Sequence, residues 1–189
     1  MRPLVYEGGV ASVAFFAAFI LYSVAEGVLQ ARTQTEARDP SRTWMVIGSL
    51  AGLALAFVLA GDPHLPGPDC LPVAIGLALM ALGTVLRYWS VATLGRFFTV
   101  TVEVGEDHQL VERGPYALLR HPSYTGMLVV YLGVGVALDS WTGAAAAVLV
   151  PAAAVVNRIA HEERLLQERL GPSYVRYQGR TKRLVPGVW

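Results

Sequence analysis

Residues 122–159 have the sequence PSYTGMLVVYLGVGVALDSWTGAAAAVLVPAAAVVNRI, two apolar segments that only Asp139-Ser140 separates. A helix rises 1.5 Å per residue, so about 20 apolar residues cross a hydrocarbon core of about 30 Å. We therefore expect a tight antiparallel hairpin of two transmembrane helices, whose outer ends return to one membrane face. The small residues from Gly143 to Ala147 favour close packing within the hairpin, and Pro151 is a candidate kink in its second helix.

The two segments of the hairpin are Pro122–Leu138 and Trp141–Ile159. Three more apolar segments precede them, at about Gly8–Leu29, Trp44–Ala60 and Leu71–Val91. The 189 residues are 54% hydrophobic and only 15% charged, which is unusual for a soluble domain. These patterns predict an all-α integral membrane bundle of five transmembrane helices. We expect one domain over residues 1–189, with three N-terminal helices in 1–92, and a loop, the hairpin and an amphipathic extension in 93–189.

Composition also excludes several classes of protein. The single cysteine, Cys70, rules out an intrachain disulfide, and no paired Cys/His spacing suggests a metal site. The net charge of +1 gives no reason to expect a nucleic acid partner.

Basic residues predict the orientation in the membrane, because Arg and Lys accumulate in cytoplasmic loops. The segment 61–70 has no basic residue, whereas the opposite end carries Arg32, Arg38 and Arg42, then Arg96, Arg113 and Arg120, and finally six basic residues between Arg164 and Arg183. We expect the C-terminus and the polar motifs to face the cytoplasm. The Arg-rich, Lys-poor composition is typical of a GC-rich bacterial genome, so we expect the bacterial cytoplasmic membrane.

The last apolar segment becomes amphipathic at His161 and continues to Leu170, before Gly171-Pro172 ends it. We therefore expect the fifth helix to project beyond the membrane. Its apolar residues are expected to lie on the loop 93–120 or on lipid headgroups.

Polar residues at this end of the hairpin suggest a binding site. Pro122 suits a first helical position, so the amide groups of Ser123 and Tyr124 would present the positive end of the helix dipole to a carboxylate or phosphate. Arg158 and Glu162, four residues apart, share a helix face. A zwitterion with a carboxylate and a sulfonium or ammonium would find partners for both charges. Alternatively, Arg158 and Glu162 form only an intrahelical pair, and His121 only caps the helix.

A family resemblance extends this interpretation. The motif residues His108-Gln109-Leu110-Val111, Gly114, Tyr116, Arg120-His121-Pro122-Ser123-Tyr124, Gly126, Arg158 and Glu162-Glu163 resemble those of the isoprenylcysteine carboxyl methyltransferase family. The resemblance implies a membrane enzyme that binds S-adenosyl-L-methionine in a cytoplasmic pocket without a Rossmann domain. It also implies a lipophilic substrate that enters from the bilayer.

The resemblance assigns roles position by position. It places the cofactor beside His108, Gln109, Leu110, Val111, Tyr116, His121, Pro122, Ser123 and Tyr124. It implies a catalytic pair in which Glu162 contacts the cofactor and Arg158 faces the substrate's acceptor group. It implies no metal.

The identity of the methyl acceptor stays open at this point. A carboxylate is already ionised and needs alignment and desolvation more than a base, whereas a phenol or enol needs a base such as His121 or Glu163. In a bacterium we expect a small lipid, such as a phenolic or pyrone lipid, rather than a prenylated protein. The alternatives are a phospholipid N-methyltransferase, an NADPH-dependent membrane sterol-type reductase and a non-catalytic scaffold or transporter.

Several polar residues outside these motifs are expected to lie outside the site. We interpret Arg87 as a snorkelling cation near the end of the third helix and Glu26 as a helix-end residue. Tyr174 and Tyr177 are expected at the membrane interface.

Overall fold

The computed structural model describes residues 3–33, 39–61, 64–66, 68, 70–98 and 110–189. The chain is helical over most of this part, and the elements are the helices α1 (Val10–Thr33), α2 (Pro40–Val58), α3 (Cys70–Leu94), α4 (Pro122–Ala137), α5 (Trp141–Leu170) and α6 (Pro172–Arg180), with the short 3₁₀ turns η1 (Leu4–Tyr6), η2 (Gly95–Phe97) and η3 (Gly114–Ala117). The all-α prediction is confirmed.

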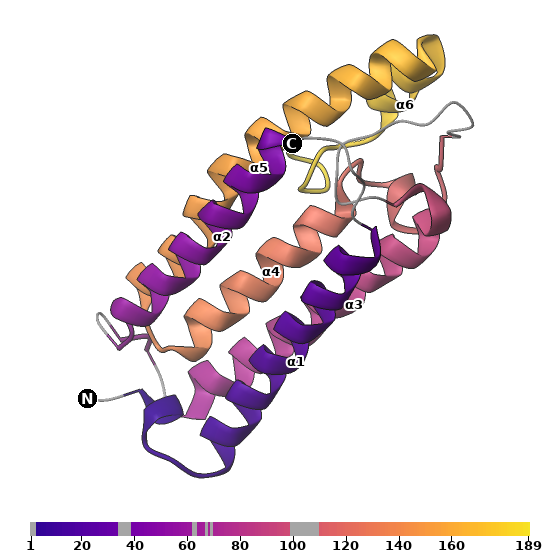
Figure 1. Cartoon of the computed structure of the whole chain (residues 1–189). Coiled ribbons are helices and arrows are strands. Elements are labelled where there is room, and N and C mark those ends of the chain that lie inside the picture. Colours follow the sequence, from indigo (N-terminus) through magenta and orange to yellow (C-terminus); the bar gives the residue numbers. More distant parts are fainter. Residues whose placement is uncertain (1–2, 34–38, 62–63, 67, 69, 99–109) are drawn as a thin grey trace.

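Among the described residues, four helices are long and apolar enough to cross a membrane: α1, α2, α3 and α5. The fourth predicted segment, α4, has 16 residues and is shorter than a usual span. Most of its residues are nevertheless buried, because α4 lies along α3 on one side and α5 on the other. The five predicted segments thus correspond to four long helices and one shorter helix that lies between α3 and α5 (Figure 1), and the expected count of five spans stays a prediction.

Glycines allow α3 and α4 to approach closely. A Cβ atom added to Gly76 would lie 2.6 Å from the carbonyl oxygen of Gly133, and one added to Gly83 would lie 2.6 Å from that of Gly126. Any side chain at these positions would have to push the two backbones apart. The predicted α4–α5 hairpin is present as well, and Gly135 packs directly on Ala144.

The fifth helix runs without interruption from Trp141 to Leu170, as its predicted continuation beyond His161 requires. Its projection beyond the membrane stays a prediction. Pro151 does not break α5. Its ring packs instead on α2, where a Cβ added to Gly52 would lie 2.7 Å from Pro151 Cδ. Gly171 then adopts a positive φ of 56°, which favours glycine, and Pro172 begins α6.

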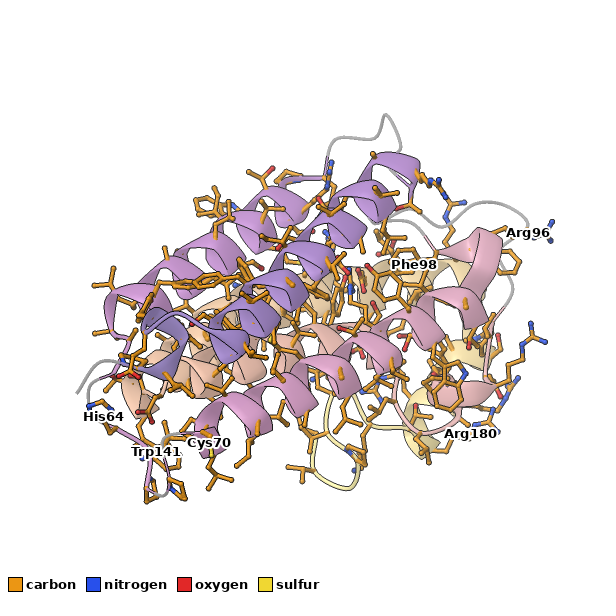
Figure 2. All side chains as sticks on the ribbon, turned by 90° about the horizontal axis from the view of Figure 1, so that it is seen from below. His64, Cys70, Arg96, Phe98, Trp141 and Arg180 are labelled. Atoms are coloured by element: carbon orange, nitrogen blue, oxygen red, sulfur yellow. The ribbon has the colours of Figure 1, made fainter. Side chains whose placement is uncertain are left out.

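The connections divide the molecule into two ends. The end of α1, the start of α2, the end of α3 and the start of α4 gather at the end of the bundle that also carries α6 (Figure 1). Figure 2 shows Arg96 and Arg180 at this end and His64, Cys70 and Trp141 at the other. The basic segments of the sequence therefore share one end, which we call the basic end.

At the basic end, the C-terminal residues fold back over the start of α4. The amide of Arg120 donates to Lys182 O at 2.7 Å, and the amide of His121 donates to Arg183 O at 3.0 Å. Tyr174 and Tyr177 are only 2% and 3% exposed, so their expected interfacial position is wrong. The Tyr177 hydroxyl donates to Tyr116 O at 2.7 Å and Leu119 O at 3.2 Å.

Candidate active site

Arg158 occupies the centre of the candidate site, with its side chain 1% exposed. Its Nε atom donates to the Tyr124 hydroxyl at 2.6 Å and lies 3.2 Å from Glu162 Oε1. Its Nη1 atom donates to Asp39 Oδ2 at 2.9 Å and to Ser41 Oγ at 3.2 Å. Arg158 and Glu162 therefore form more than an intrahelical pair, because α4 and the start of α2 also bind this guanidinium.

His121 lies between the two carboxylates of α5. Its Nδ1 atom is 3.3 Å from Glu162 Oε2, and its Nε2 atom is 3.4 Å from Glu163 Oε1. The second contact is electrostatic, since Nε2 has no hydrogen bond of good geometry and is buried. The His121 side chain makes no capping bond to α4. The alternative that it serves only as a helix cap is therefore wrong.

The same two carboxylates control the charge of His121. Burial alone would lower the pKa of this imidazole, but the close carboxylates of Glu162 and Glu163 outweigh burial and raise it. A raised pKa favours the protonated, cationic form. His121 then has little capacity to accept a further proton.

Glu163 ties the C-terminal residues to the site. Its Oε1 accepts from Arg120 Nε at 2.7 Å, and its Oε2 accepts from Arg183 Nη2 at 2.8 Å. Arg120 also donates to Thr181 O at 2.5 Å. A carboxylate held by two guanidinium groups is a poor base, so this geometry favours a structural role for Glu163 over the role of base.

Ser123 binds a residue that the sequence interpretation placed elsewhere. Arg87 Nη1 donates to Ser123 Oγ at 2.7 Å and Ser123 O at 3.3 Å, and Arg87 Nη2 donates to Glu26 Oε2 at 2.6 Å. The Arg87 side chain is 5% exposed. The expectations of a snorkelling Arg87 and a helix-end role for Glu26 are therefore wrong: the two residues form a buried ion pair between α3 and α1.

The remaining predicted residues are less central. Tyr116 is buried in η3, and burial, followed by the nearby charge of Glu162, raises the pKa of its phenol. Leu110 and Val111 are partly buried just before η3. His108 and Gln109 lie outside the described residues. The amide of Tyr124 was predicted to be free for a ligand, but it donates to His121 O at 3.1 Å.

The sequence interpretation missed Asp39, Ser41 and Arg183 as members of the cluster, and it included Arg120 in the motif without a role. One local signal was available for Asp39. An aspartate immediately before proline is a typical helix N-cap, and α2 does begin at Pro40 rather than at the predicted Trp44. No local signal joins it to Arg158, because 119 residues separate the two positions.

The cluster as a whole is close to electrically balanced, with Asp39, Glu162 and Glu163 facing Arg120, Arg158, Arg183 and His121. Its donor set fits a zwitterionic cofactor such as S-adenosyl-L-methionine. The Glu162 side chain is 18% exposed and so can meet a cation, and the Arg183 side chain, 35% exposed, can meet a carboxylate. The described residues contain no group of three or more His, Cys, Asp or Glu placed to hold a metal ion.

The fold and the site together define a class: polytopic helical membrane proteins with a buried ionic centre at one end of the bundle. The family model for phospholipid methyltransferases matches residues 71–173. The probable protein-S-isoprenylcysteine O-methyltransferase of Oryza sativa subsp. japonica is 30% identical over 173 residues, which is 86% of this chain and 89% of that protein. The chain therefore belongs to the isoprenylcysteine carboxyl methyltransferase family of integral membrane proteins, and the resemblance found in the sequence is confirmed.

Two further relatives extend this comparison. Protein-S-isoprenylcysteine O-methyltransferase B of Arabidopsis thaliana is 37% identical over 115 residues, 60% of this chain and 58% of the relative. The structure of the eukaryotic intramembrane Ras methyltransferase, an isoprenylcysteine carboxyl methyltransferase, superposes with a TM-score of 0.71 at 25% identity, covering 96% of this chain and 70% of that one. The chain thus spans little more than half of the Arabidopsis relative.

Proposed function

We propose that this protein is an S-adenosyl-L-methionine-dependent O-methyltransferase of the membrane, which methylates a carboxylate or hydroxyl oxygen of a lipophilic acceptor. The observation that carries the proposal is the convergence of His121, Tyr124, Arg158 and Glu162 in one buried cluster at the basic end. Membership of a methyltransferase family supports the reaction type.

In this proposal each residue has a distinct task. The cofactor supplies a methyl group on a sulfonium. Glu162 faces the cofactor's positive charge, and the segment from His121 to Tyr124 walls its pocket together with Tyr116, Leu110 and Val111. Arg158 orients the acceptor oxygen. Alignment of this kind lowers the barrier because the reacting groups meet in a fixed geometry.

The electrostatics favour an acceptor that is already ionised. A hydroxyl acceptor must lose a proton, but the raised pKa of His121 favours its cationic form, and Glu163 is held by Arg120 and Arg183. A carboxylate acceptor is already ionised and therefore needs neither His121 nor Glu163 as a base. We therefore propose an isoprenylcysteine-like carboxylate as the acceptor, in keeping with the names of the relatives, and place a phenolic or pyrone lipid second.

The proposed location follows from the charge distribution. The site lies at the basic end, where the C-terminal residues meet the start of α4 and where Figure 2 shows Arg96 and Arg180. Because positive loops stay in the cytoplasm, we propose that the site faces the cytoplasm. The membrane would be the bacterial cytoplasmic membrane, as the composition suggests.

A methyl-transfer assay tests this function. Protein purified in detergent is incubated with S-adenosyl-L-methionine carrying a labelled methyl group and with either an S-farnesylated cysteine derivative or a long-chain phenol. We expect label in the farnesylcysteine, and a loss of about 100-fold or more in Arg158→Ala. Arg164→Ala, an exposed arginine of the same helix, serves as the matched control and should retain activity. Absence of transfer to any lipid acceptor, or equal activity in Arg158→Ala, would contradict the proposal.

A further inference from the structure

Asp39 reaches the candidate site from the start of α2, a helix that packs on α5. Its Oδ2 atom accepts from Arg158 Nη1 at 2.9 Å, and its side chain is 4% exposed. Asp39 precedes α2, whereas Tyr124 and Glu162, which also contact Arg158, belong to α4 and α5. Three separate elements therefore meet at one guanidinium.

The second oxygen of the same carboxylate is held by the start of α2. Asp39 Oδ1 accepts from the amide of Ser41 at 3.0 Å and from the amide of Arg42 at 3.4 Å, which is the usual geometry of a helix N-cap. The Ser41 hydroxyl also donates to Oδ1 and accepts from Arg158 Nη1 at 3.2 Å. The helix start thus fixes the direction in which Oδ2 points.

The contacts bind different edges of the guanidinium. Tyr124 and Glu162 meet Nε, which lies nearest the aliphatic stem, whereas Asp39 and Ser41 meet the terminal Nη1. Contacts at Nε alone allow the guanidinium plane to rotate about the Nε–H direction. A second contact at Nη1 fixes the plane, because the guanidinium is rigid.

We propose that Asp39 is a positioning residue for methyl transfer, which fixes the guanidinium plane of Arg158 toward the acceptor oxygen. This inference rests on the proposed function, in which Arg158 orients the acceptor. Asp39 also shares the positive charge of Arg158 with Glu162, so an acceptor carboxylate is oriented without being held so tightly that it loses nucleophilicity. Misplacement by about 1 Å can cost about 100-fold in rate.

The variant Asp39→Asn separates this role from the helix cap, because asparagine caps helices about as well as aspartate. The matched control is Asp139→Asn at the opposite end, where a partly exposed aspartate pairs with His64 at 2.6 Å. For Asp39→Asn we expect a kcat at least about tenfold lower and an affinity for S-adenosyl-L-methionine within about twofold of wild type. Asp139→Asn should leave both values unchanged.

Each other outcome overturns the inference. An unchanged kcat in Asp39→Asn means that Arg158 needs no positioning from α2. A higher kcat with a lower KM for the acceptor means that Asp39 competes with the acceptor. A loss of cofactor affinity means that Asp39 maintains the whole site rather than Arg158.

A thermal-unfolding cycle gives a readout that does not depend on turnover and so separates failure of this inference from failure of the proposed function. If Asp39 acts through Arg158, the double variant Asp39→Asn/Arg158→Gln melts within about 1 °C of Arg158→Gln alone. Additive shifts in melting temperature would overturn the contact itself, even in a protein that methylates no acceptor.

Discussion

His121 is the residue whose charge depends most directly on its surroundings, since two carboxylates of α5 raise its pKa in the folded protein. In the unfolded chain this pKa returns to about 6.5. A raised folded-state pKa adds stability that is fully present below about pH 6.5 and is lost as the pH rises through the folded-state value. We therefore expect the melting temperature in detergent to fall over this range in wild type and to fall less in His121→Gln. Equal slopes in the two proteins would show that Glu162 and Glu163 do not hold a protonated His121.

At the scale of residues, the sequence predicts one part of the site and omits another. His121 and Tyr124 come together with Arg158 and Glu162 because the hairpin returns both motifs to one end. Asp39 could not be assigned in this way, because its contact with Arg158 depends on how α2 packs on α5. Arg183 is a similar case, since the fold-back of the C-terminal residues brings it to Glu163.

At the scale of elements, glycine contacts keep α3 and α4 close together along their length. A Cβ added to Gly76 would lie 2.6 Å from backbone atoms of α4. We expect Gly76→Ala to destabilise the protein by about 1–3 kcal/mol, because the two helices must separate. Gly27→Ala on α1 is the control, since its Cβ would meet nothing within 4 Å. Thermal unfolding of both variants in detergent tests this; equal stability would mean that α3 and α4 are less closely packed.

The ion pair of Glu26 and Arg87 joins α1 to α3 and, through Ser123, to the first turn of α4. Removing one charge leaves the other buried without its partner, at a cost of about 3–5 kcal/mol. We expect Glu26→Gln to show this loss in thermal unfolding, and the double variant Glu26→Gln/Arg87→Met to recover much of it. If the double variant is as unstable as Glu26→Gln, the loss in Glu26→Gln does not come from the unpaired charge of Arg87.

The sequence pattern predicts the cores of the helices better than their boundaries. Apolar runs predict the cores of α1 to α5, but α2 begins at Pro40 because Asp39 caps it, not where the apolar run begins. The helix α6 has no apolar run and was not predicted. Its buried Tyr177 bonds to the segment before α4, through Tyr116 O and Leu119 O, a tertiary contact that no local pattern encodes.

At the scale of the whole molecule, an apolar bundle with an ionic cluster at one end suits an enzyme that meets a lipid in the bilayer and a soluble cofactor outside it. Four helices of the described part are long enough to cross, and the shorter α4 lies between α3 and α5. The all-α membrane fold could be predicted because the length and hydropathy of its segments determine it. The packing of α2 on α5, which brings Asp39 to Arg158, required the structure.

Calorimetric titration of the purified protein with S-adenosyl-L-methionine, S-adenosylhomocysteine and NADPH in parallel tests the central claim most directly. We expect both adenosyl ligands to bind and NADPH not to bind. We also expect Glu162→Gln to weaken the binding of S-adenosyl-L-methionine at least about tenfold, the loss expected for one charged contact. The exposed Glu168→Gln is the control on the same helix and should bind as wild type does. Binding of NADPH alone, or an affinity for S-adenosyl-L-methionine that Glu162→Gln leaves unchanged, would contradict the account.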